Sequence, residues 1–400
     1  MNVVVLHRNF PGQFRHIVRH LVQGGHRLVG VGNMQAPGLA GVDLVRYDSK
    51  KLKIGGHRFL ATVSSGVAHG EVVAHALTQL RGRGFVPDVV LAHPGWGEAL
   101  YVKDVFPDVR LVSLFEFFYH AQGVDVGFEP GTEADFDQRA NLRCRNMLHL
   151  TNLELCDAAV SPTAWQRSVH PATYHHKIQV AHEGVDTTLM APDKAARFAL
   201  PDGRELAPGD PVITFVARNL EPYRGFHRLM RTLPDIQRRC PEALTVIVGG
   251  DSVSYGRAPK DAANWREKLL AEVGPQLDLT RVVFTGQIPY LTYRSLLQVS
   301  AAHVYLTYPF VLSWSMLEAM SCGCLVLGSA TPPVLEVLRH NENGLTFDFF
   351  DNDGLANLVE AALAHPENVT HLRTQARADI VANYDIQHGI QHYMKLLQGS

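Results

Sequence analysis

The sequence predicts an α/β protein built from two doubly wound domains, each with a parallel sheet between layers of helices. Short, fully apolar runs that are typical of buried parallel strands alternate with helical periodicity along the whole chain. At 400 residues the chain exceeds what one hydrophobic core usually organises. The pattern also stops in a stretch rich in Pro, Gly and charge between 184 and 210, and then restarts. These three observations together predict two domains of similar architecture.

The first half of the chain opens as strand, loop, helix and strand. A strand at 2–6 is followed by a loop from His7 to Gly12, a helix to about Gln23 and a strand at 28–31. Further strands are expected at 89–92, 111–114, 158–160 and 178–180. From Gln122 to Arg143 the chain is polar and irregular, and helical periodicity returns from Asn146 to Leu155. We expect a loop at 122–143, and the sequence does not assign it a role.

The second half repeats this rhythm without visible sequence repetition. Its strands are expected at 212–216, 244–248, 282–284 and 304–306. Helical sequence from about Thr370 to Leu397 ends the chain, with an interruption near 383–385.

Composition excludes several classes of protein. Hydrophobic residues make up 46% and the formal net charge is -2, so the chain is globular and has no field that would gather nucleic acid. Five dispersed cysteines favour reduced thiols in a cytoplasm over a disulfide framework. No run approaches about 18 apolar residues, so neither a membrane span nor a signal peptide is expected. We expect a cytoplasmic protein that would meet any membrane-anchored substrate from the cytoplasmic face.

No metal site is expected. The 21 histidines show no spacing typical of metal ligands. Asp135-Phe136-Asp137 and Asp351-Asn352-Asp353 fit an Asp-x-Asp pattern, but both stand in polar segments without the strand context of such a site.

The strongest motif runs from Ser313 to Ser329. A polar turn leads into a helix that carries Glu318, after which Gly323 ends the helix and a new strand begins. Exposed backbone N–H groups at a helix start can receive phosphate. A carboxylate one turn further in can accept both ribose hydroxyls. The alternative is an ordinary helix–strand unit with a solvated glutamate.

This motif resembles the signature of family 4 glycosyltransferases of the GT-B fold, and weaker similarity spans nearly the whole chain. Three further segments support the resemblance: Arg218 to Gly225, Gly184-Val185-Asp186 and Phe284-Thr285-Gly286. The resemblance implies two facing Rossmann-like domains, with a C-terminal helix that crosses back to the first. We expect an acceptor-side domain at 1–185 with the crossing helix at 376–400, a linker at 186–210, and a nucleotide-sugar domain at 211–375.

The resemblance also implies a reaction. The chain is expected to be a retaining, metal-independent hexosyltransferase that uses a nucleotide diphosphate sugar as co-substrate and needs no cofactor. The acceptor would be a glycan, a lipid-linked molecule or a protein in cell-surface glycan or glycoconjugate synthesis, and contact with the cytoplasmic membrane face is left open. No nucleic-acid partner is expected.

Donor-binding roles follow for residues of the second domain. Thr285 and Gly286 would lie near the base and Glu318 on the ribose. Two cations on one loop suit a departing diphosphate that gains negative charge. The diphosphate would be held by Arg218, Arg224 and backbone near Leu312 and Ser313. The spacing of the two arginines is one residue longer than the family's usual pattern.

One position departs from the family pattern. The family's paired glutamates have seven residues between them; Glu318 matches the second, and Phe310 stands at the first. That first glutamate usually touches the donor sugar, and a phenyl ring cannot accept a hydrogen bond from a hydroxyl. The donor sugar therefore stays open. So does a catalytically silent subunit that only binds nucleotide sugars.

Candidate residues of the first domain follow strand ends, where ligands bind in open parallel sheets. Gly12 is a donor-facing candidate, although a plain turn is an alternative. Glu116 follows a strand and suits a general base or a hydroxyl acceptor; its alternative is an ion-pair partner. The acceptor- or sugar-facing candidates are Asn9, Gln13, His93, Gly95 and His120. A third reading of the whole chain, a GT-B nucleotide-sugar epimerase, also stays open, as do the nucleotide, the acceptor and the oligomeric state.

Overall fold

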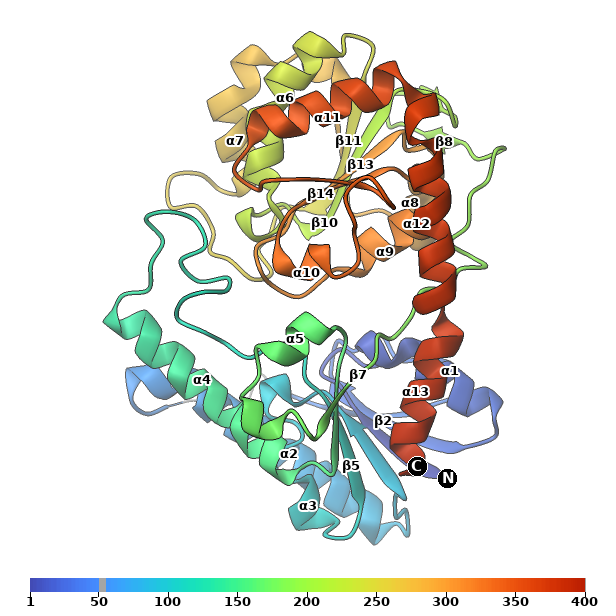
Figure 1. Cartoon of the computed structure of the whole chain (residues 1–400). Coiled ribbons are helices and arrows are strands. Elements are labelled where there is room, and N and C mark those ends of the chain that lie inside the picture. Colours follow the sequence, from blue (N-terminus) through green and yellow to red (C-terminus); the bar gives the residue numbers. More distant parts are fainter. Residues whose placement is uncertain (50–54, 400) are drawn as a thin grey trace. The chain divides into compact units, whose positions relative to one another are not determined.

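The computed structural model describes residues 1–49 and 55–399. The chain divides into two compact units (Figure 1). Unit 1 holds Met1–Gly184 together with the C-terminal segment that begins at Ile386, and unit 2 holds Val185–Asp385. Among the described residues, no helix combines the length and the apolar character that a membrane span requires.

Unit 1 is built on a parallel sheet of seven strands in the order β3-β2-β1-β4-β5-β6-β7. The strands are β1 (Asn2–Leu6), β2 (Arg27–Asn33), β3 (Asp43–Tyr47), β4 (Val89–Ala92), β5 (Arg110–Leu114), β6 (Ala158–Ser161) and β7 (Ile178–Val180). The helices are α1 (Arg15–Gln23), α2 (Ala61–Gly82), α3 (Val102–Val105), α4 (Phe136–Leu155), α5 (Ala164–Ser168) and α13 (Ile386–Gln398). The chain order reverses between β1 and β4, which is the doubly wound arrangement that the sequence predicted.

The central strand β1 is buried on both faces. Val3 and Val5 pack into one core cluster with side chains of α1 and α13, while Val4 and Leu6 pack into another with side chains of α2 and α3. Because side chains alternate along a strand, an uninterrupted apolar run fills both layers at once. Tyr393 of α13 is 1% exposed in the first of these clusters, and α13 lies along α1 (Figure 1).

Unit 2 repeats the architecture with six parallel strands in the order β12-β11-β10-β13-β14-β15. They are β10 (Val212–Asn219), β11 (Leu244–Gly250), β12 (Val282–Gly286), β13 (Ala302–Tyr305), β14 (Val326–Ser329) and β15 (Leu345–Phe347). The helices are α6 (Phe226–Arg239), α7 (Trp265–Val273), α8 (Tyr290–Val299), α9 (Trp314–Ser321), α10 (Pro332–Leu335), α11 (Asn352–Ala364) and α12 (Thr370–Asn383). Unit 2 is therefore also a doubly wound α/β unit, as the sequence predicted.

The segment 186–210, which we expected to be a linker, belongs to unit 2. It carries a small antiparallel pair, β8 (Phe198–Ala199) and β9 (Glu205–Leu206). Phe198 and Leu206 are buried in a core cluster with β10 and β11. The apolar residues between the prolines and glycines therefore anchor this segment to the sheet.

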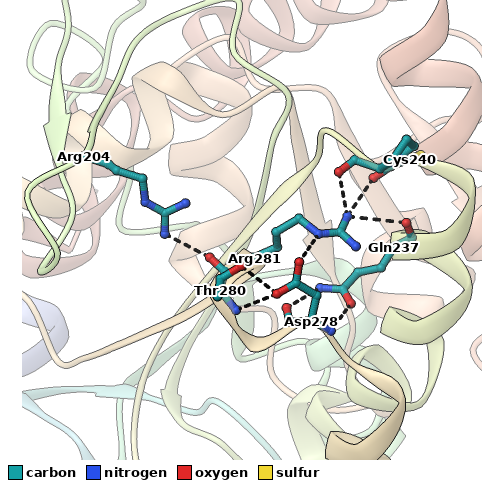
Figure 2. A network of polar contacts seen from close by, with 7 residues as sticks. Arg204, Gln237, Cys240, Asp278, Thr280 and Arg281 are labelled. Carbon is teal, nitrogen blue, oxygen red and sulfur yellow. Dashed lines mark hydrogen bonds and ion pairs between the residues drawn. The ribbon is translucent and has the colours of Figure 1, made fainter.

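A polar network fastens the same segment to the base of the unit 2 sheet (Figure 2). Arg204, in the turn between β8 and β9, donates to the carbonyl of Thr280 at 3.0 Å. Asp278 pairs with Arg281 at 3.0 Å, and its backbone exchanges two hydrogen bonds with the Gln237 side chain at the end of α6. These contacts explain the charged residues of a segment that we expected to be a linker.

Two helix boundaries also differ from expectation. The crossing segment begins at Ile386, ten residues after the predicted 376, because α12 packs Ala376 and Ile380 into the core of unit 2. Helix α4 begins at Phe136, inside the segment expected to be a loop. Asp135 and Gln138 form a reciprocal capping box at its start, so the Asp-x-Asp pattern here marks a helix N-terminus.

Candidate functional site

The strongest sequence motif forms a helix start whose carboxylate is held in place. Ser313 caps α9, and its hydroxyl accepts from the Ser315 N–H at 3.3 Å. The Ser313 N–H donates to the Tyr305 hydroxyl at 2.8 Å, which ties the cap to the end of β13. Glu318, one turn into α9, is 7% exposed. Its carboxylate accepts from the hydroxyls of Tyr290 at 2.7 Å and Tyr293 at 2.9 Å.

Arg218 places an exposed positive charge at the end of a strand of unit 2. It lies at the carboxyl end of β10, and its side chain is exposed. Its guanidinium has no hydrogen-bond or ion-pair partner within residues 1–49 and 55–399. Its backbone carbonyl accepts from the Gln287 side chain at 3.4 Å, which joins it to the loop after β12. Arg218 is therefore available to an anion beyond the sheet edge, where ligands of parallel sheets bind.

Arg224, the second expected cation, is only 7% exposed. Its Nη1 donates to Thr307 Oγ1 and to the carbonyl of Val311, both at 2.9 Å. The guanidinium also lies over the ring of Tyr255, 5.3 Å from its centroid. In this arrangement Arg224 braces the segment that leads to α9, while Arg218 presents its charge to solvent.

The remaining donor candidates lie at the end of β12 and just before the start of α9. Gly286 ends β12 with φ +67, and a Cβ there would meet nothing within 4 Å, so the position is open. The Thr285 hydroxyl donates weakly to the Ile247 carbonyl at 3.4 Å and so is partly committed to the sheet. Leu312 is 5% exposed, and its side chain belongs to the core. What Leu312 can offer a ligand is its backbone.

Phe310 packs within an aromatic cluster. Its ring is 5% exposed and lies 5.5 Å from Tyr223 and 4.9 Å from Tyr255, between ring centroids. The ring of Tyr308 packs against Tyr223, tilted, with 4.8 Å between the ring centroids. The place of the family's first glutamate is thus filled by a ring that Tyr223 and Tyr255 contact.

Glu221 is a structural carboxylate that sequence reasoning missed. It is 0% exposed, and its oxygens accept from the backbone N–H groups of Ser254, Tyr255 and Gly256 at 2.8–3.2 Å. It therefore fixes the loop that brings Tyr255 onto Arg224 and Phe310. A glutamate inside an otherwise basic loop, Arg218 to Gly225, was the signal for it in the sequence.

In unit 1, strand ends bring several predicted residues into one polar network. Gln13 donates to one oxygen of Glu116 at 2.8 Å, and His93 donates to the other at 2.9 Å. His7, which sequence reasoning did not single out, contacts the Gln13 side-chain oxygen through Nε2 at 2.6 Å. The ring of Trp96 stacks on His93 at 4.3 Å.

Hydrogen bonds assign the protons in this network. The Nδ1 atoms of His7 and His93 accept from the backbone N–H groups of Asn9 and Gly95, so each Nε2 carries the hydrogen. Burial raises the pKa of Glu116, but hydrogen bonds donated by His93 and Gln13 outweigh it and hold the pKa at about 2. A general base works best with a pKa near the working pH. The network therefore favours Glu116 as an ionised acceptor of hydroxyl groups over Glu116 as a base.

The other first-domain candidates do not all belong to this network. Gly12 has φ +52, and a Cβ there would lie 2.2 Å from the His7 ring, so the glycine is required by that ring. Asn9 is exposed, and its oxygen accepts from Asn33 at 3.4 Å. A Cβ at Gly95 would lie 2.8 Å from the His93 ring. His120 joins a different group: its Nε2 contacts the Val169 carbonyl at 2.7 Å, and its ring packs on Phe118.

Across the part of the chain that the structure describes, no three His, Cys, Asp or Glu side chains gather as metal ligands would.

Two family models match the chain. The model described as "Glycosyl transferase family 4 group" matches residues 24–190, and that described as "Glycosyl transferases group 1" matches residues 200–379. Together they match the larger part of both units.

The chain has low sequence identity to an individual relative. The chain is similar to a GDP-mannose-dependent alpha-(1-6)-phosphatidylinositol monomannoside mannosyltransferase of Mycolicibacterium smegmatis, with 26% identity over 231 residues. That match spans about half of each protein, 54% of this chain and 55% of the relative.

Solved structures share the fold over the full length of both chains. Sucrose-phosphate synthase from Thermosynechococcus elongatus has a TM-score of 0.74 at 16% identity, and HepE from Anabaena, solved in complex with UDP, has 0.70 at 14%. The helix start with Glu318, the cation at the end of β10, the two matching models and the shared architecture agree: the chain belongs to the family 4 glycosyltransferases and has the GT-B fold.

Proposed function

We propose that the chain transfers a hexose from a nucleoside diphosphate sugar to a hydroxyl of a carbohydrate-containing acceptor, with retention of configuration and without a divalent metal. The observation that carries this is the pairing, within unit 2, of a capped helix start bearing Glu318 with the exposed Arg218. A carboxylate suits the ribose hydroxyls, and an exposed cation suits a diphosphate.

The chemistry follows from charge. As the bond between the sugar and the diphosphate breaks, negative charge grows on the leaving phosphate. Arg218 would stabilise that charge, because a preorganised cation acts most strongly on charge that develops in the transition state. Retention is what the family resemblance implies.

In unit 1 the ionised Glu116 is proposed to accept a hydrogen bond from an acceptor hydroxyl. Gln13 and His93 keep the carboxylate charged and oriented, since each donates to a different oxygen. With a pKa of about 2, Glu116 would orient the nucleophile and leave the proton to another group. We propose that the donor phosphate receives it.

The names of the relatives suggest which donors to try first. One relative is named for GDP-mannose and a phosphatidylinositol-linked acceptor, and HepE was solved with UDP and with UDP-glucose. We therefore propose GDP-mannose or UDP-glucose as donor. The acceptor would be a surface glycan or lipid-linked intermediate, met at the cytoplasmic face of the membrane.

The test is a transfer assay with the purified chain and each donor over lipid and oligosaccharide acceptors, read as released nucleoside diphosphate and as new product. Transfer that is abolished in Glu318→Gln but kept in Arg238→Ala, an exposed arginine on α6, supports the proposal. NMR of the product gives the configuration at the anomeric carbon. An inverted product would contradict retention, and turnover only with added Mg²⁺ would contradict metal independence.

A second candidate is a catalytically silent subunit that binds nucleotide sugars. The observation in its favour is Phe310, whose buried ring stands where the family carries a sugar-contacting glutamate. Binding of a sugar nucleotide with no hydrolysis or transfer over any acceptor would favour this candidate. Measurable turnover by the purified chain alone would eliminate it.

A further inference from the structure

Two tyrosines of helix α8 donate hydrogen bonds to the carboxylate of Glu318 on α9. Tyr290 and Tyr293 are three residues apart on α8, so both phenols project from the same face of that helix. The hydroxyl of Tyr290 donates to Oε1 of Glu318 at 2.7 Å, and that of Tyr293 donates to Oε2 at 2.9 Å. Each carboxylate oxygen therefore has a phenol donor of its own.

The two phenols differ in environment. Tyr293 is 7% exposed and Tyr290 is 41% exposed, so one donor comes from the core and the other from the surface. Burial and the negative charge of Glu318 raise the pKa of Tyr293 well above its ordinary value, so its hydroxyl stays protonated at any working pH. The arrangement is a charge-assisted clamp, and bonds of this kind are about twice as strong as neutral ones.

A clamp matters because a glutamate side chain can rotate. A carboxylate that must meet two neighbouring hydroxyls has to present both oxygens in one plane at one angle. A carboxylate oxygen has room for more than one donor, about four positions per group in all. Phenols that fix the plane of the carboxylate can therefore leave room for a diol, and they spare the ligand the cost of ordering it.

We propose that Tyr290 and Tyr293 are positioning residues that hold the Glu318 carboxylate ready for the two ribose hydroxyls of the donor nucleotide, and so set the preference for ribonucleotides over 2′-deoxyribonucleotides. This rests on the proposed role of Glu318 in nucleotide binding. It goes further in naming what orients that carboxylate and which chemical difference in the ligand depends on it.

The experiment measures dissociation constants by calorimetry for UDP and GDP and for their 2′-deoxy forms. The wild-type chain is expected to bind one ribonucleotide at least tenfold more tightly than its deoxy form, because a site built for a hydroxyl rejects a ligand that lacks it. Tyr293→Phe should weaken ribonucleotide binding about tenfold, leave deoxynucleotide binding nearly unchanged and thus erase most of the preference. Tyr290→Phe should act in the same direction by a smaller factor.

Two controls separate positioning from general damage. Tyr174→Phe removes a phenol that donates to Glu154 in unit 1, and it should change neither constant. In a Glu318→Gln background, Tyr293→Phe should have no further effect on the preference, because the oriented charge is already gone. Tyr290 is exposed, so Tyr290→Phe tests the clamp even if the buried substitution disturbs folding.

The outcomes are distinct. If the wild-type chain binds neither ribonucleotide, or binds it no better than its deoxy form, the proposed role of Glu318 fails and the clamp with it. If the wild-type chain prefers the ribonucleotide and both tyrosine variants keep the full preference, the clamp is wrong and the proposed function stands. A variant that weakens both ligands equally would also overturn the clamp.

Discussion

Mild acid should unfold unit 1 before unit 2. Three of the buried histidines of unit 1, His149, His170 and His182, are 6%, 3% and 9% exposed. Burial, as the largest cause in each, lowers their pKa to about 3, 4 and 4. In unit 2, burial lowers the pKa of His303 to about 3. The perturbation is a change from pH 7.5 to pH 5.0.

The size of the effect follows from proton linkage. Above pH 6.5 these histidines are neutral in both states. As pH falls below 6.5 the unfolded chain takes up protons that the folded chain refuses until about pH 3–4, so stability is lost across that window. At pH 5.0 each histidine costs about 2 kcal/mol, from about 1.5 pH units at about 1.4 kcal/mol each. Unit 1 should lose about 6 kcal/mol and unit 2 about 2 kcal/mol.

The titration of Glu116 does not change stability between pH 7.5 and 5.0. Its folded pKa of about 2 lies below the ordinary value of a glutamate. Its contribution is therefore full above about pH 4.5 and is lost only as the pH falls on toward 2.

The assay is urea unfolding at both pH values, followed by hydrogen exchange so that peptides report each unit separately. His149→Phe should shrink the acid loss of unit 1 by about 2 kcal/mol, because the rings of Phe115, Phe118 and Tyr119 already surround that position. His75→Gln, at an exposed position on α2, is the matched control. Equal stability of unit 1 at pH 7.5 and 5.0, or an unchanged loss in His149→Phe, would refute the reasoning.

Three further predictions follow from single contacts. Glu221→Gln should destabilise unit 2 by about 3–5 kcal/mol, measured by urea unfolding, since three backbone donors lose a charged acceptor; a loss below about 1 kcal/mol would contradict its anchoring role. Glu116→Gln should lower kcat/KM for transfer about 10- to 100-fold by a factor constant from pH 6 to 9, whereas a factor that varied with pH would restore the general-base reading. Gly97→Ala should lower Tm well below Gly84→Ala, because both have positive φ but a Cβ at Gly97 alone would meet the Gly66 carbonyl, 2.1 Å away.

The fold could be predicted because strands and helices leave periodic signals. The run at 3–6 is apolar throughout, and the strand that contains it is buried on both faces. The start of α4 was not predicted, because its signal, the Asp135 capping box, lies in a polar segment. Asp135 and Asp137 were considered only as an Asp-x-Asp metal-binding pattern. The 186–210 segment was misassigned because buried Phe198 and Leu206 are spaced among residues typical of linkers.

The candidate site was predictable where a motif carried it. Local patterns single out Glu318 and Arg218; Arg218 lies at the carboxyl end of β10 and Glu318 lies one turn into α9. The phenols on Glu318 could not be found in this way, because Tyr290 and Tyr293 reach it from a helix 25 or more residues earlier. The difference between Arg218 and Arg224 was equally hidden: two arginines on one loop look alike until Thr307 and Val311 are seen to hold one of them.

The most direct test of the account is calorimetric binding of UDP-glucose and GDP-mannose to the wild-type chain, Arg218→Ala and the control Arg238→Ala, each in EDTA and in Mg²⁺. The account predicts that one donor binds the wild-type chain and the control equally well with or without Mg²⁺, and binds Arg218→Ala at least tenfold more weakly. Binding that requires Mg²⁺, or that is unchanged in Arg218→Ala, would contradict it.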